Sequence, residues 1–253
     1  MDLSEVEQRL FLSGDDFRAK VRAQGRARCH WAEELRHDDA EYKRLLLELK
    51  ERRMIYFSFA CKESVGLFTV EMKEGKLRLI IDCRRLNQRM KTPPRTPLAS
   101  SCAFGELASS SEGLWYAGHD VANCFYNFRI PDALSLYLGM RPVRAGDVKV
   151  KMVDGVPVSP SALICPRLTV LPMGFSFALH WAQQARLNIL FRAKVVDPNE
   201  LIVDFRPPPP MEKGKPATIV YVDNAIFIGG DLAELGKTGC VSARFGKCRF
   251  ART

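Results

Sequence analysis

The chain has 253 residues, of which 47% are hydrophobic and 26% charged, a composition typical of a folded protein that excludes an intrinsically disordered one. The formal net charge is +9, and seven Lys/Arg with the single acid Asp82 lie between Lys76 and Arg95. A basic balance of this kind favours a polyanionic partner, nucleic acid before an acidic membrane. The eight cysteines form no CxxC pair, so we expect buried thiols in a reducing compartment and no zinc site.

The N-terminal region carries acids where a signal peptide needs bases followed by an apolar core. The longest uncharged run, Leu168 to Ala185, contains Pro172, Gly174 and His180, which favours a core turn and helix over a membrane span. We therefore expect an intracellular protein, cytoplasmic or nuclear, with no membrane partner. Residues 1–37 are charged and weakly periodic, which indicates an arm or peripheral helices.

The first half of the remaining chain reads as a helix followed by a hairpin. Asp38 or Asp39 can cap a helix running to Phe57, with acids early and bases late. Two β-rich segments follow, separated by a Gly-containing turn, and a proline-rich connection comes after them. The expected strands are Val65–Val70 and Leu77–Asp82, and the expected turn is Lys73–Lys76.

The second half predicts more strands and one long helix. A strand at Leu114–Val121 ends near Asp120, and a turn or short helix follows it at Asn123–Phe128. Further strands are expected at 137–143 and 148–158, the latter with an Asp154-Gly155 hairpin turn. The segment 171–196 predicts a Pro/Gly turn and then a helix of about five turns. Residues 206–216, RPPPPMEKGKP, indicate an inserted loop, and residues 231–253 a basic tail.

The segment TIVYVDNAIFIGG, Thr218–Gly230, predicts a hairpin with Asp223-Asn224 as its turn. Asp120 and Asp223 both follow apolar strand residues, where an isolated buried carboxylate is costly. Two such carboxylates at neighbouring strand ends can share that cost by binding Mg²⁺, which accepts one or two carboxylates together with water and phosphates. The spacing alone leaves open whether the two aspartates meet, and turn chemistry is the alternative.

Four segments, in order, resemble motifs of reverse transcriptases (RNA-directed DNA polymerases) of the retrotransposon type. KEGKLRLIIDCRRLNQ resembles the fingers motif, DVANCFYNF the first palm motif, LPMGFSFALHWAQQ the L-P-Q-G segment, and YVDNAIFIGG the Y-x-D-D hairpin. The resemblance covers about Val65 to Gly230. It implies an α+β fingers–palm fold with an antiparallel palm sheet backed by helices, and a thumb that is absent or incomplete. The implied organisation is an N-terminal arm at 1–37, fingers and palm at 38–230, and a C-terminal tail at 231–253.

The resemblance also implies residue roles for template-directed addition of deoxynucleotides to a primer 3′-hydroxyl by two-metal catalysis. The implied partners are an RNA or DNA template-primer and deoxynucleoside triphosphates, and the implied cofactor is Mg²⁺ or Mn²⁺. Asp120 and Asp223 would be catalytic carboxylates, and the metal ligands would be Asp120, the Val121 carbonyl, Asp223 and Asn224. The expected substrate-binding residues are Lys73, Arg78, Phe125 and Gly174, and the expected nucleic-acid-binding residues are Tyr221, Arg84 and Arg85.

The sequence departs from the family pattern at informative positions. Asn224 replaces a second aspartate and brings an amide oxygen without charge, and Met173 replaces a polar glutamine. Two alternatives therefore stay open beside the enzyme: a catalytically inactive polymerase fold that only binds nucleic acid, and a truncated product without an independent role. An unrelated α+β interaction module would require four ordered matches to be accidental. The oligomeric state is not predicted.

Overall fold

The computed structural model describes residues 2–105, 114–210, 216–230, 233, 235 and 247–252. The chain divides into two compact units, each discontinuous in sequence. The first unit consists of Met1–Pro93 and Phe125–Ala178, and the second of Pro94–Cys124 and Leu179–Thr253. Among the described helices, none combines the length and the apolar character that a membrane crossing requires.

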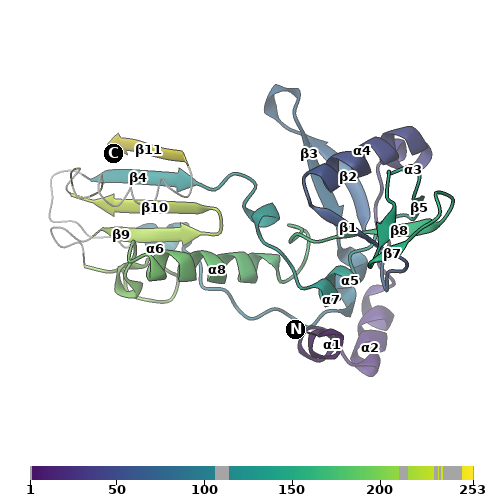
Figure 1. Cartoon of the computed structure of the whole chain (residues 1–253). Helices are drawn as coiled ribbons and strands as arrows, with labels where there is room; N and C mark the ends of the chain where they lie inside the picture. Colours follow the sequence, from purple (N-terminus) through teal and green to yellow (C-terminus); the bar gives the residue numbers. More distant parts are fainter. Residues whose placement is uncertain are drawn as a thin grey trace. The chain divides into compact units, whose positions relative to one another are not determined.

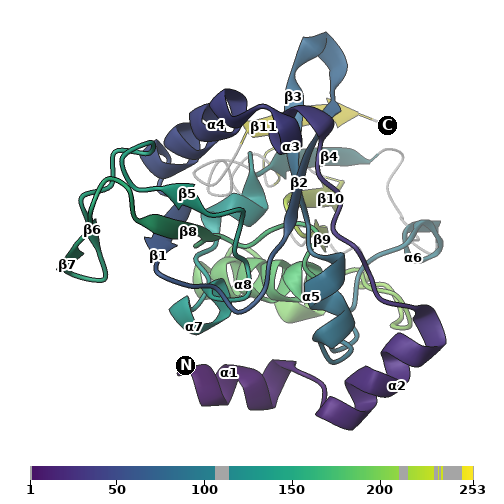
Figure 2. The same cartoon turned by 90° about the vertical axis from the view of Figure 1, so that its right-hand side faces the viewer.

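The first unit combines short helices with three small antiparallel sheets, visible from the side in Figure 2. The sheets are β1-β8-β5, the long β2-β3 hairpin and the short β6-β7 hairpin. Its elements are α1 (Leu3–Leu10), α2 (Gly14–Gln24), α3 (Glu33–His37), α4 (Asp39–Glu51), β1 (Ile55–Ser58), β2 (Gly66–Glu71), η1 (Lys73–Gly75), β3 (Leu77–Asp82), α5 (Arg84–Arg89), α7 (Asp132–Ser135), β5 (Val143–Arg144), β6 (Met152–Val153), β7 (Val156–Pro157) and β8 (Leu163–Leu168), with η2 (Cys124–Asn127) at its boundary.

Helix α4 begins as predicted and ends earlier than predicted. The Asp38 side chain accepts hydrogen bonds from the amides of Ala40 and Glu41, which confirms it as the cap. The helix stops at Glu51 because Arg53 adopts a positive φ of 56° and the Met54 amide donates back to the Leu49 carbonyl. The Arg53 amide also donates to the Lys50 carbonyl, and the two bonds form a Schellman motif. The chain leaves the helix there, and residues 55–58 form β1.

The hairpin predictions for this unit are largely confirmed. β2 and β3 pair from Gly66 opposite Asp82 to Glu71 opposite Leu77. β6 and β7 flank the predicted Asp154-Gly155 turn, where both residues have positive φ. The predicted strand at 137–143 is wrong except at its last residue, which starts β5; the β1-β8 pairing was not predicted.

The second unit is an antiparallel four-stranded sheet in the order β11-β4-β10-β9, with α8 running along one face (Figure 1). Leu190 of α8 packs with Ala117, Val220, Ala225 and Phe227 of the sheet. The expected antiparallel sheet backed by a helix is therefore present. The elements are α6 (Ser101–Gly105), β4 (Trp115–Asp120), α8 (Ala178–Arg192), η3 (Pro198–Glu200), β9 (Ala217–Tyr221), β10 (Asn224–Gly229) and β11 (Lys247–Arg252).

Two details of the second unit differ from the sequence prediction. The hairpin turns at Val222-Asp223, one residue earlier than predicted, and Asn224 is the first paired residue of β10. The C-terminal segment contains β11, which pairs with β4 from Lys247 opposite Asp120 to Arg252 opposite Trp115. β4 is consequently an interior strand of the sheet.

Candidate functional site

Three neighbouring strands bring predicted site residues into one row across the sheet of the second unit. Asn224 of β10 lies opposite Asp120 of β4 on one side and opposite Tyr221 of β9 on the other. Directly opposed residues of antiparallel strands project to the same face, with Cβ atoms about 4.5–5.5 Å apart. All three side chains are exposed. The row therefore lies on the open face at one end of the sheet.

Asp223 stands beside this row at the tip of the hairpin. Its carbonyl accepts a hydrogen bond of 3.0 Å from the Val121 amide, which follows Asp120 directly. Its carboxylate accepts a bond of 3.0 Å from the Asn224 side-chain amide. The structure thus brings Asp120, Val121, Asp223 and Asn224 together at the same end of the sheet, where β4 ends and β10 begins; this place is called the edge below.

Neither carboxylate is buried, contrary to the expectation from their apolar neighbours. Asp120 is exposed and Asp223 is half-buried, while His119, Val222 and Ala225 next to them in sequence are buried. The alternation of a strand explains the difference, since successive side chains point to opposite faces. The cost of an isolated buried charge therefore gives no reason for a metal here, whereas the placement of two carboxylates at the same end of neighbouring strands does.

A buried glutamine holds the hairpin tip in an unusual conformation. Gln183 of α8 donates through Nε2 to the Val220 carbonyl at 2.8 Å and accepts from the Val222 amide through Oε1 at 2.7 Å. Val222 has a positive φ of 54°, a conformation that β-branched residues strongly disfavour. Such strain persists only where surrounding contacts determine the backbone. The two Gln183 bonds, closed off from water, supply that restraint.

Behind the open row, the covered face of the sheet carries a buried histidine. His119 stacks on Phe227, with ring centroids 6.2 Å apart, and its Nε2 accepts a hydrogen bond from Arg186 of α8. Burial and the positive charge of Arg186 lower the pKa of His119 to about 4, against a hydrogen bond to the Ala225 carbonyl that favours the charged form. His119 is therefore neutral near pH 7.

The buried Cys124 thiol lies near both aspartates, and both affect its pKa. Burial raises the pKa of Cys124, and the negative charges of Asp223 and Asp120 raise it further, while the positive charge of Arg186 lowers it. A single thiol is therefore within electrostatic reach of both carboxylates. Asp120 and Asp223 therefore both lie close enough to Cys124 to act on the same side chain.

The donor set at this edge fits a divalent cation of the Mg²⁺ type. Within the described ranges there is no group of three or more His, Cys, Asp or Glu side chains placed to hold a metal. Two carboxylates, an amide oxygen and a main-chain carbonyl are hard oxygen donors of the kind Mg²⁺ accepts when water and phosphates complete its shell. The chemistry of the edge is thus suited to Mg²⁺ or Mn²⁺ and not to a closed, all-protein metal cage.

The other predicted residues lie in the first unit. Lys73 and Arg78 are exposed on the β2-β3 hairpin. Burial raises the pKa of Tyr126, and Arg78 is close enough for its charge to oppose that shift. Phe125 is half-buried in η2. The exposed side chains of Lys73 and Arg78 are therefore accessible to an anionic ligand.

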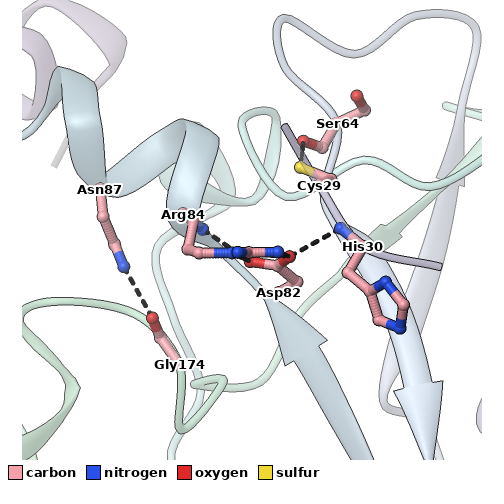
Figure 3. A network of polar contacts seen from close by, with 7 residues as sticks. All are labelled: Cys29, His30, Ser64, Asp82, Arg84, Asn87 and Gly174. Atoms are coloured by element: carbon pink, nitrogen blue, oxygen red, sulfur yellow. Dashed lines mark hydrogen bonds and ion pairs between the residues drawn. The ribbon is translucent and has the colours of Figure 1, made fainter. Parts of the chain in front are cut away.

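Arg84 and Arg85 both form ion pairs within the chain. Arg84 contacts Asp82 at 2.6 Å, and Arg85 contacts the buried Glu63 at 2.7 Å. The Asp82 carboxylate also accepts from the His30 amide at 2.7 Å (Figure 3). Burial alone would raise the pKa of Asp82, but these hydrogen bonds outweigh it and lower the pKa. The contacts make both arginines part of the unit's internal framework, and their contact with nucleic acid stays a prediction.

Gly174 has a packing role that the sequence did not reveal. Its carbonyl accepts from Asn87 Nδ2 at 2.8 Å (Figure 3). Asn87 Oδ1 in turn accepts from the Ser176 amide at 2.9 Å. A Cβ at position 174 would lie 2.5 Å from the Ile81 carbonyl oxygen. Glycine is therefore required here by the close approach to β3, independently of any nucleotide.

Sequence reasoning missed His119, Arg186 and the strained Val222. The alternation along β4 could have placed His119 on the covered face, because Asp120 must then point the other way. A polar residue inside the apolar helix segment was a signal for Arg186. No local signal identifies Val222, since its backbone is set by a contact from α8.

The fold of the chain is similar to that of known proteins. The mixed arrangement of helices and antiparallel sheet is similar in fold to a region of reverse transcriptases. The expected reverse-transcriptase-like fold is confirmed at this level. No protein-family model and no curated protein matches the sequence.

Three of the similar solved structures are viral enzymes. Two are foamy viral protease-reverse transcriptases bound to double-stranded DNA, both with a TM-score of 0.54, 14% identity and 87% of this chain covered. A third is the native protease-reverse transcriptase of prototype foamy virus, with a TM-score of 0.52, 14% identity and 85% of this chain covered. The chain spans 31%, 37% and 24% of those three chains, respectively. At this identity the likeness concerns the fold.

Proposed function

We propose that this chain performs reverse-transcriptase-like nucleotidyl transfer, with the second unit's sheet as the palm and the β2-β3 hairpin as part of the fingers. The observation that carries the proposal is the placement of Asp120 and Asp223 at the same end of an antiparallel sheet, where β4 ends and β10 begins. The reaction joins the primer 3′-hydroxyl to the α-phosphorus of a deoxynucleoside triphosphate and releases pyrophosphate. The partners are an RNA or DNA template-primer and the triphosphates.

The two aspartates and their neighbours hold the cofactor in this proposal. Asp120, Asp223, the Val121 carbonyl and the Asn224 amide oxygen would bind Mg²⁺ or Mn²⁺, and the bound ion would neutralise charge at the reacting phosphate. The clamp from Gln183 to Val220 and Val222 orients the hairpin and keeps Asp223 at the edge. Tyr221, on the same open face as Asp120, would contact the primer end.

The first unit supplies the remaining roles. Lys73 and Arg78 would bind the triphosphate, since exposed cations bind phosphate oxygens. Phe125 would pack beneath the sugar and exclude a 2′-hydroxyl. Gly174 would allow the chain to approach the nucleotide, and Arg84 and Arg85 would contact the nucleic-acid backbone. The net charge of +9 supports salt-sensitive binding of this kind.

A non-catalytic nucleic-acid-binding protein of the same fold is the second candidate. Asn224 favours it, because an amide holds a divalent cation less tightly than a carboxylate does. The exposed Met173, which stands where the family has a glutamine, also favours it, since a thioether is a poor hydrogen-bonding group. Both candidates bind a template-primer, and they differ in whether the primer grows.

The deciding experiment is primer extension on RNA and DNA templates, with Mg²⁺ and Mn²⁺ in separate reactions. The parent should extend the primer, and Asp120→Asn should abolish extension while its melting temperature and template-primer affinity remain close to those of the parent. Asp154→Asn, at the exposed tip of the β6-β7 hairpin, is the matched control and should extend normally. Equal extension by Asp120→Asn and the parent contradicts the catalytic role. Binding without extension by the parent selects the second candidate.

A further inference from the structure

The connection before β9 contains a run of four prolines that the proposed site does not use. Residues 205–210 read FRPPPP, and they lie between η3 and β9 of the second unit. Phe205 is 86% exposed, and the proline run is exposed or half-buried along its length. An exposed apolar segment in a described part of the chain calls for a physical explanation.

Sequence alone restricts the conformation of this run. Each proline holds φ near −65°, and each residue that precedes a proline is excluded from the helical region. Arg206 and the first three prolines all precede a proline. The backbone of Pro207, Pro208 and Pro209 therefore strongly favours the polyproline II helix, and Pro210 shares the fixed φ of that helix. With three residues per turn, Pro207 and Pro210 lie on the same edge of that helix.

The run is presented from a fixed base. Before it, the Ile202 amide donates to the Thr218 carbonyl at 2.8 Å, and the Asp204 amide donates to the Leu98 carbonyl at 2.9 Å. The Asp204 carboxylate accepts from the Ser100 amide at 2.8 Å. The fold thus anchors the segment at its N-terminal end and leaves the prolines outside it.

The aromatic and basic residues at the start of the run have different uses. The Arg95 guanidinium lies 4.3 Å from the centre of the Phe205 ring, so Arg95 and Phe205 are partners within the fold. Arg206 is exposed and makes no ion pair within the part of the chain that the structure describes. The proline run Pro207–Pro210 is thus preceded directly by a solvent-exposed cation, Arg206.

We propose that residues 206–210 are a docking segment for a protein module that binds polyproline II helices. Such modules, of the SH3, WW and EVH1 kinds, receive the proline ridges in a groove lined by aromatic side chains. The preformed helix has little conformational entropy left to lose on binding. An acidic pocket beside the aromatic groove would receive Arg206, so the partner module is acidic at that end. Because Ile202 and Thr218 are already hydrogen bonded to each other, the prolines between them are not needed to complete the sheet.

The test measures binding of the full chain to a panel of purified SH3, WW and EVH1 domains. At least one domain should bind saturably. The double variant Pro207→Ala/Pro210→Ala should weaken that binding at least tenfold, and Arg206→Ala should weaken it several-fold. A synthetic peptide of residues 204–210 should compete with the chain for the same domain. All variants should melt with the parent, because the substituted side chains contribute little to the core.

The matched control is Pro94→Ala/Pro97→Ala, which removes two prolines with the same spacing from an exposed stretch of the same unit. It should bind like the parent, because the residues between these two prolines already have partners within the fold. Thr96 is hydrogen bonded to His180 at 2.9 Å, and the Arg95 guanidinium lies over the Phe205 ring. The proposal is overturned if no domain of the panel binds, if the Pro207/Pro210 variant binds as tightly as the parent, or if only the control variant loses binding. None of these outcomes depends on primer extension.

Discussion

Replacing Gln183 by methionine tests whether α8 determines the shape of the hairpin tip. Methionine has nearly the volume of glutamine but can neither donate to Val220 nor accept from Val222. Gln183, Val220 and Val222 are 1%, 2% and 3% exposed, so water cannot replace the lost partners. Each buried group left without a partner costs about 1–3 kcal/mol. For two groups the central expectation is about 4 kcal/mol of unfolding free energy.

That loss is large enough to measure by thermal unfolding. About 4 kcal/mol corresponds to a fall in melting temperature of roughly 8–16 °C for a protein of this size. The strain at Val222 adds a local consequence, because φ 54° is maintained only while its amide is held. If Mg²⁺ binds as proposed, the rise in melting temperature that it produces should therefore be smaller in Gln183→Met than in the parent.

The control is Gln184→Met, at the next position of α8, where the side chain is half-buried and makes no described hydrogen bond. It should melt within about 2 °C of the parent, as substitutions away from such features usually cost under ~0.5 kcal/mol. If Gln183→Met melts together with Gln184→Met, the clamp does not hold the hairpin and the reasoning is wrong.

Three further predictions concern other parts of the structure. Asn224→Asp should increase the Mg²⁺-dependent rise in melting temperature and slightly lower the metal-free value, because it adds a like charge beside Asp120 and Asp223. Unchanged values in both states would mean that Asn224 is only a paired residue of β10 and not a metal ligand. Gly174→Ala should cost about 1–3 kcal/mol through its clash with the Ile81 carbonyl, whereas Gly105→Ala, where a Cβ meets no atom of the described residues within 4 Å, should not; equal urea midpoints would contradict this. His119 has a folded-state pKa of about 4, below its ordinary value, so its contribution to the unfolding free energy is fully present above roughly pH 6.5 and is lost as the pH falls towards 4. Between pH 7 and 5 the unfolding free energy should fall by about 2 kcal/mol from this cause. His119→Leu should remove that pH slope, whatever the absolute stability of the variant.

The features that were predicted correctly depend on local chemistry. The Asp38 cap, the Asp154-Gly155 turn and the β2-β3 hairpin are determined by residues within a few positions of one another. The strands β1, β8 and β11 were missed because each is stabilised by pairing with distant segments, which a short apolar run does not reveal. The same reason explains why spacing alone could not bring Asp120 and Asp223 together: their proximity follows from the β4-β10 register.

The candidate site shows where local rules are overridden. A turn centred on Asp223-Asn224 is the natural prediction, since Asp and Asn tolerate turns better than valine does. The structure instead turns at Val222-Asp223, and Gln183 compensates for the unfavourable backbone. The predicted roles of Lys73 and Phe125 depend on a bound substrate, and no arrangement of side chains alone determines them.

The discontinuous make-up of the two units has a consequence for how the chain is synthesised. β4 leaves the ribosome roughly 100 residues before β10, its partner, so at about 5–20 residues per second it waits on the order of 5–20 s with both edges open. The first unit can be completed within that interval, because its last segment ends at Ala178, before β10 is made, whereas the second unit must wait for β10. Unpaired strand edges invite association between chains, so nascent chains of this protein should depend on chaperones more than chains whose domains close in sequence order.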